Sequence, residues 1–254
     1  PPILFGSLRM AIVFICLLPF LKFQLPNSKY LLPLFGFGIS MGMSVNLFLY
    51  LSVNASNILS PIVIGAQLSI PIAIIISSIF IGENISGKKW ILIFTSFLGI
   101  LLIAFDPKIA DEILGFLLIC CMAFFYASAQ VFSRYLKELD VKFTNACMGG
   151  IGFISLLILS IYFEGNTVAH LKELNADAWL LALYHGVLCS LMGHMSMFYL
   201  YKFYPVGQVL PFYALFPVFG ILLSFFIFGE IPTLIMVIGG IIVITSVFLL
   251  QKIR

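Results

Sequence analysis

A few polar side chains lie deep inside long apolar stretches of this sequence, where they could bind a polar ligand. Arg9 could hold a carboxylate through charge-assisted hydrogen bonds, or could extend to the nearest aqueous surface or pair with another helix. His194 could bind a carboxylate or carry a proton near neutral pH, or could be a neutral histidine bonded to a neighbouring helix. His185 lies closer to the end of its apolar stretch, so His194 is the stronger candidate.

Other candidates recur at helical spacing. Asn46 and Tyr50 follow the small-residue pattern of Gly38 and Gly42 at intervals of four, which places all four broadly on one face of a helix. The glycines favour close helix approach, and Asn46 suits either interhelical bonding or the lining of a cavity.

Two prolines interrupt other apolar stretches. Gln67 and Pro71 share a stripe, while Pro217 lies with Tyr213 in a second stretch. A proline in a helix frees a carbonyl, and interrupted segments at matching positions in two halves often mark a transporter site. The alternative interpretation is a simple kink.

The same residues argue against catalysis. No acidic cluster, Gly-x-Ser-x-Gly pattern or metal-binding spacing is present, and His185 and His194 are nine residues apart on opposite helix faces. The five cysteines lack disulfide or zinc spacing. We therefore expect no enzyme activity, no cofactor and no metal.

Composition shows which elements must position these residues. The 254 residues are 62% hydrophobic and only 9% charged, whereas soluble domains carry about 25% charge. This excludes a soluble enzyme, a nucleic-acid binder and a disordered chain, and a net charge of +3 offers no polyanion site. The expected partners are the lipid bilayer and a small-molecule substrate, with the oligomeric state left open.

Long apolar runs in lipid must be helices, and each needs about 20 residues to cross. The fold class is therefore an all-α polytopic membrane protein. Nine spans are predicted, near residues 2–21, 30–52, 60–81, 90–105, 113–133, 144–163, 179–201, 206–228 and 232–251.

Charge placement orients these spans. Ten Lys and Arg residues fall on the side of the C-terminus and two on the other side. This bias predicts a cytoplasmic C-terminus and residue 1 on the outer side. We expect the membrane to be a bacterial inner membrane. An outer N-terminus without a signal peptide predicts one further helix upstream.

The sequence also predicts an inverted repeat. Gly82-Glu83 and Gly229-Glu230 each end an apolar run, and the glutamates are 147 residues apart on opposite predicted sides. A shift of 147 residues aligns the chain from Ser60 onward with the chain from Gly207 onward. The predicted copies cover residues 1–105, with four spans, and 113–251, with five. The two glutamates are expected to end helices and contact the interface.

These features resemble the EamA-type transporters of the drug/metabolite transporter superfamily. The similarity rests on the opening Pro1–Arg9, on Gly82-Glu83 with Ile85-Ser86-Gly87-Lys88, on Ala214–Val218, and on Gly229-Glu230. It is greatest to exporters of cysteine-pathway metabolites and amino acids. The resemblance implies ten helices in two inverted halves around a central cavity, and it adds Tyr126 and Gln130 as cavity-lining candidates.

The resulting prediction is a secondary exporter of small polar metabolites, amino acids or derivatives, that works by alternating access. A drug or nucleotide-precursor carrier of the same fold and a non-transporting receptor or scaffold are the alternatives. The candidate substrate-binding residues are Arg9, Asn46, Tyr50, Gln67, Tyr126, Gln130, His194, Tyr199 and Tyr213. The candidate hinge and helix-end residues are Pro71, Pro217, Gly82, Glu83, Gly229 and Glu230.

Overall fold

The computed structural model describes residues 1–21, 26–82, 86–106, 112–204 and 216–253, and the regular structure in these ranges is helical. Six helical runs are long and apolar enough to cross a membrane, and Leu234–Leu250 is a shorter apolar helix. The all-α membrane fold expected from composition is confirmed.

The helices follow the predicted spans closely. Their bounds are α1 Pro2–Leu17, α2 Leu31–Phe37, α3 Val45–Asn54, α4 Ser60–Gly65, α5 Ser69–Ile81, α6 Gly87–Ala104, α8 Ile113–Tyr135, α9 Val141–Phe163, α10 Thr167–Lys172, α11 Ala176–Leu183, α12 Met195–Leu200, α14 Phe216–Phe228 and α15 Leu234–Lys252. The predicted span 206–228 is described only from residue 216 onward.

Three predicted spans are interrupted. A π-helical segment, Gly38–Ser44, joins α2 to α3, and a second one, Tyr184–His194, joins α11 to α12. Residues 38–44 correspond to residues 185–191 under the 147-residue shift, so the two π segments fall at equivalent positions of the predicted repeat. A 3₁₀ turn, Ala66–Leu68, separates α4 from α5, and Pro71 lies in the first turn of α5, where a missing N–H is tolerated.

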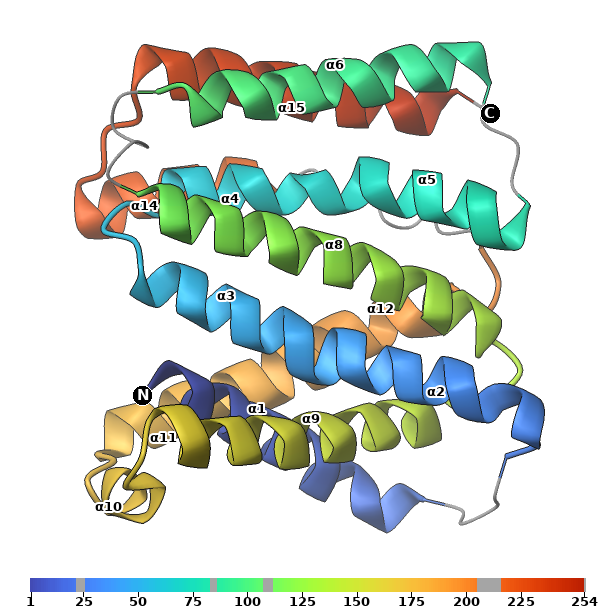
Figure 1. The fold of residues 1–254 in the computed structure, drawn as a ribbon, viewed down its shortest axis with the longest axis vertical. Coiled ribbons are helices and arrows are strands. Elements are labelled where there is room, and N and C mark those ends of the chain that lie inside the picture. Colours follow the sequence, from blue (N-terminus) through green and yellow to red (C-terminus); the bar gives the residue numbers. More distant parts are fainter. Residues whose placement is uncertain (22–25, 83–85, 107–111, 205–215, 254) are drawn as a thin grey trace. The chain divides into compact units, whose positions relative to one another are not determined.

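The chain divides into two compact units. Unit one comprises Pro1–Tyr50 and Ser128–Pro205. Its centre is the antiparallel pair α1 and α9 (Figure 1). The predicted close approach at Gly42 is present, since a Cβ added to Gly152 of α9 would lie 2.6 Å from the Gly42 carbonyl oxygen.

Unit two comprises Leu51–Ala127 and Val206–Arg254. Here α6 packs along α15 (Figure 1). The two helices touch through glycine, because a Cβ on Gly99 would lie 2.9 Å from the Gly239 carbonyl oxygen.

Each unit takes residues from both predicted repeats. The pairs α1 with α9 and α6 with α15 overlap under the 147-residue shift, and both pairs are antiparallel, as oppositely oriented copies require. The repeat boundaries 1–105 and 113–251 remain a prediction.

Candidate functional site

Unit one holds a buried polar cluster around Arg9. The Arg9 side chain on α1 is only 4% exposed. Its Nε donates a hydrogen bond to Ser190 Oγ at 2.9 Å, and its Nη1 donates to Tyr50 Oη at 3.3 Å. Gly186 lets α1 approach the second π segment, because a Cβ there would lie 2.7 Å from the Ile12 side chain.

His185 completes the cluster. Its Nδ1 lies 3.4 Å from Tyr50 Oη, and the Phe5 ring packs edge-on against both rings, with centroids 5.2 Å from Tyr50 and 5.6 Å from His185. Ser190 Oγ donates to the His185 carbonyl oxygen at 3.0 Å while it accepts from Arg9. The second π segment thus supplies Ser190 and His185, two of the three polar side chains described around the guanidinium.

The electrostatics of this cluster are unbalanced. A guanidinium has five N–H donors, and the recorded bonds of Arg9 use two of them. Among the described residues no carboxylate pairs with Arg9, and the recorded ion pairs join Lys29 to Glu138 and His170 to Glu173. A buried cation without a counterion among the described residues is costly, so this cluster is a candidate anion-binding site.

Three carboxylates in the described part of the chain bond groups near the starts of helices. Glu164 accepts from the Ile3 and Leu4 amides at 2.8 and 2.9 Å, and Glu112 accepts from the Asn57 amide at 2.9 Å. Asp106 accepts from the Thr233 hydroxyl. These carboxylates satisfy N–H or hydroxyl groups near helix starts.

The residues predicted to end helices do so in two ways, as glycines after a helix and as a glutamate that caps the start of another. Gly82 ends α5 with φ +78°, and Gly229 follows α14 with φ +68°, the left-handed backbone that glycine adopts most easily. The Glu230 carboxylate accepts from the Leu59 amide at 2.9 Å, the Ser60 amide at 3.2 Å and the Ser60 hydroxyl at 3.1 Å, so it caps α4. Glu83 lies outside the described residues. Pro217 is the second residue of α14.

Two other predicted site residues of unit one bond backbone carbonyl oxygens of their own helical runs. Asn46 Nδ2 donates to the carbonyl oxygens of Met41 and Gly42 in its own helical run, at 3.0 and 2.9 Å. The His194 ring bonds the Cys189 carbonyl oxygen at 2.8 Å. Tyr199 is 53% exposed.

Three predicted residues keep buried amide atoms with no hydrogen-bond partner among the described residues. They are Asn46 Oδ1, Gln67 Oε1 and both terminal side-chain atoms of Gln130. Buried amides without partners are uncommon and call for water or a ligand. Gln67 and Tyr126 are buried in unit two, and Tyr213 lies outside the described residues.

Sequence reasoning missed Ser190 and placed His185 second to His194. The physical reason is the π segment, whose wider turn changes which side chains share a helix face. Residue type gave no signal for this widening. The predicted repeat is aligned only from Ser60 onward. The two π segments are seen to be equivalent when the same 147-residue shift is applied to residues before Ser60.

Long apolar helices with a polar cluster inside one of their bundles define a polytopic helical membrane protein. Comparison with known families then matches residues 113–251 to the EamA-like transporter family, which is more than half of the chain. The chain belongs to the EamA-like transporter family, which confirms the resemblance at family level.

Relatives agree with this assignment. The chain is 27% identical over 162 residues to the "Uncharacterized transporter YdfC" of Bacillus subtilis (strain 168). These aligned residues are 63% of the chain. The chain spans about half of that relative, 51% of its length. A solved structure titled "Crystal structure of protein" has the same fold, with a TM-score of 0.63 and 17% identity, covering 100% of this chain and 89% of that one.

Proposed function

We propose that this protein is a secondary transporter that exports a small carboxylated metabolite, an amino acid or a relative, across a bacterial inner membrane. One observation carries the proposal: Arg9 is buried in a membrane span, with hydroxyl partners and no carboxylate among the described residues. Charged groups at membrane depth are costly, so they mark a functional site by default.

The chemistry of the cluster suits a carboxylate. The unused N–H groups of Arg9 can form the paired, charge-assisted bonds that a planar carboxylate accepts. Tyr50 and His185 lie within reach of the same guanidinium, and both can donate to a ligand oxygen. The Phe5 and Tyr50 rings beside them offer aromatic faces that favour an ammonium group, the second charge of an amino acid.

Alternating access is the proposed mechanism. Inverted repeats let one half adopt the conformation of the other, which exposes a shared site to each side in turn. The antiparallel pairing of shift-related helices in both units supports this mechanism. We place Asn46, Gln67, Tyr126, Gln130, His194, Tyr199 and Tyr213 as further candidate ligand contacts, with Arg9 as the anchor.

Counterflow in proteoliposomes tests the proposal, with radiolabelled amino acids and related carboxylates offered in turn. We expect at least one of these compounds to exchange faster than in protein-free vesicles. Arg9→Met should reduce that exchange about tenfold to a hundredfold, because a hydrogen bond to a charged group contributes a free energy of that size. Arg9→Lys keeps the charge without the paired geometry and should retain part of the activity. Tyr162→Phe is the control, because this exposed side chain lies outside the proposed site and makes no recorded hydrogen bond.

The outcomes separate the alternatives. Exchange that persists unchanged in a folded Arg9→Met variant would refute Arg9 as the anchor. Movement only of planar drugs or nucleotide precursors would replace the substrate class. Saturable binding without exchange would favour a receptor or scaffold.

A further inference from the structure

A small hollow lies at the predicted cytoplasmic end of unit one, and its lining shares no residue with the Arg9 cluster. Its volume is about 10 Å³. It is lined by residues of α2, α8, α9 and α12 and of the turn after α12, namely Phe37, Ser133, Leu136, Lys137, Val141, Thr144, Phe198 and Lys202.

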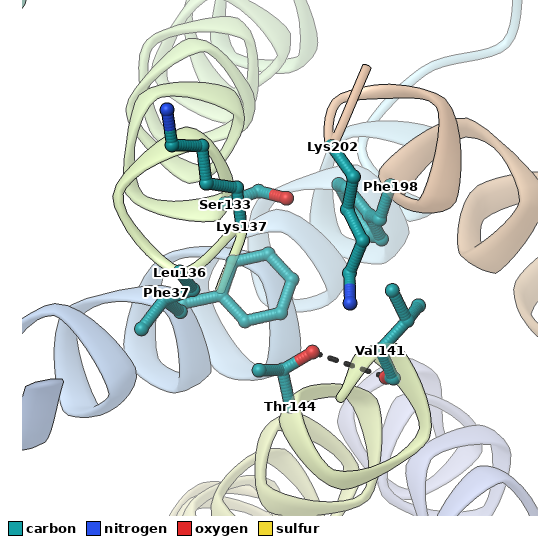
Figure 2. Close-up of a pocket in the computed structure, with 8 residues that line it drawn as sticks. All are labelled: Phe37, Ser133, Leu136, Lys137, Val141, Thr144, Phe198 and Lys202. Atoms are coloured by element: carbon teal, nitrogen blue, oxygen red, sulfur yellow. Dashed lines mark hydrogen bonds between the residues drawn. The ribbon is translucent and has the colours of Figure 1, made fainter. Parts of the chain in front are cut away.

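Lys202 is the cation of this hollow. Figure 2 shows its side chain reaching towards Thr144 and Val141, whereas the Lys137 ammonium points away from them. The structure records no ion pair or hydrogen bond for the Lys202 ammonium within the described ranges. The Thr144 hydroxyl donates to the Val141 carbonyl oxygen at 3.0 Å, so its proton is already used and the Lys202 ammonium supplies the donors for an anion.

The acidic residues of the neighbouring loop are engaged elsewhere. Glu138 accepts a hydrogen bond from the Tyr30 hydroxyl and lies 3.7 Å from Lys29 Nζ. These contacts hold the pKa of Glu138 below its usual value, so the carboxylate stays charged. Asp140 accepts from the Lys142 amide at 2.8 Å and caps α9. Lys202 is therefore available to an external anion.

The size of the hollow restricts that anion. A volume of about 10 Å³ admits about one water-sized group, so it can take a single oxygen but not a whole metabolite. The rest of the ligand must lie outside. Next to Lys202, the exposed aromatic side chains of Tyr199, Phe203 and Tyr204 are 53%, 62% and 50% accessible. Aromatic residues of this kind gather where lipid headgroups meet acyl chains.

We propose that this hollow binds a phosphate oxygen of an anionic phospholipid headgroup in the cytoplasmic leaflet. Basic pockets between transmembrane helices on the cytoplasmic side recognise such headgroups. A lipid is favoured over free phosphate because its remaining atoms can pack on the exposed aromatic side chains, whereas free phosphate gains only the Lys202 contact. The site is separate from the Arg9 cluster and does not depend on the proposed transport activity.

Native mass spectrometry of the purified protein tests this proposal. The protein is titrated with phosphatidylglycerol, with phosphatidylcholine and with inorganic phosphate, and the bound fraction of each is measured. Lys202→Met removes the charge and keeps much of the side-chain length, while Lys202→Arg keeps the charge. Lys142→Met is the matched control, because Lys142 is an exposed lysine on the same predicted side whose ammonium lies 4.9 Å from the Phe20 ring centroid, outside the hollow.

We expect the wild type to bind phosphatidylglycerol more tightly than phosphatidylcholine. Lys202→Met should weaken phosphatidylglycerol binding about fivefold, and Lys202→Arg and Lys142→Met should weaken it less than twofold. Equal losses in Lys202→Met and Lys142→Met would overturn the proposal in favour of general surface charge. Equal saturation by inorganic phosphate would overturn the lipid assignment and identify a free-anion site. If Lys202→Met fails to fold, Ser133→Leu, which fills the hollow, is tested instead. Loss of the preference for phosphatidylglycerol over phosphatidylcholine in this variant would support the proposal, and an unchanged preference would overturn it.

Discussion

Removing the Ser190 hydroxyl should destabilise the protein far more than removing another buried serine hydroxyl. Ser190 Oγ accepts from the Arg9 guanidinium at 2.9 Å and donates to the His185 carbonyl oxygen at 3.0 Å. A hydrogen bond to a charged group contributes about 1.5–3 kcal/mol, and a neutral one about 0.5–1.5 kcal/mol. The two share one oxygen and are not additive, so Ser190→Ala should cost about 3 kcal/mol.

Ser77→Ala is the matched control. Ser77 is also buried in an apolar helix, but its hydroxyl oxygen has no hydrogen-bond partner among the described residues. Replacing an unpartnered buried hydroxyl with a methyl group should be neutral or stabilising. The same substitution is thus predicted to have opposite consequences at the two positions.

Thermal unfolding in detergent measures the difference. For a chain of this size, 1 kcal/mol corresponds to about 2–4 °C, so Ser190→Ala should lower the midpoint by about 6–12 °C. Ser77→Ala should stay within about 2 °C of the wild type on the same scale. Equal shifts in the two variants would refute the reasoning that Arg9 depends on Ser190 as a buried partner.

Three further predictions concern packing, capping and pH. Gly42→Ala should disrupt α9 packing and cost about 1–3 kcal/mol in detergent unfolding, whereas Gly87→Ala, with open space around it, should not. Glu230→Gln should destabilise α4 by about 1–2 kcal/mol through loss of its charged cap, while the exposed Glu173→Gln stays neutral, as chemical unfolding can measure. Because the folded pKa of Glu138 is lowered from 4.5, its contribution is present above about pH 4.5 and is lost as pH falls through the folded value. Glu138→Gln should remove that part of the acid sensitivity of the midpoint, and an unchanged profile would contradict it.

Much of the fold could be predicted because lipid imposes a simple rule on the chain. Apolar stretches long enough to cross a bilayer become helices, and charged residues fall between them. The helix that ends at Ile81 was predictable to the residue, since Gly82 adopts the left-handed conformation there. Gly42 was also predictable as a close contact, because small residues at intervals of four allow helices to approach.

The partners of the polar groups were less predictable. Glu164 meets Ile3 and Leu4 across about 160 residues, and no local pattern encodes a contact of that range. The site depended on a second non-local feature, the π segment that brings Ser190 to Arg9. Sequence spacing assumes a regular helical period, so it could not show that Ser190 and His185 lie beside Arg9 and Tyr50. Which of these residues bind a ligand stays a prediction.

Each unit is built from two segments that are far apart in the sequence, and this has a consequence for how the chain is synthesised. α1 packs on α9, whose first residue follows the last residue of α1 by more than 120 positions. At about 5–20 residues per second, a nascent α1 waits about 6–25 s before its partner is synthesised. Residues 1–105 translated alone would contain α1 but not α9. The order of synthesis therefore leaves the helix that carries Arg9 without its α9 neighbour during that interval.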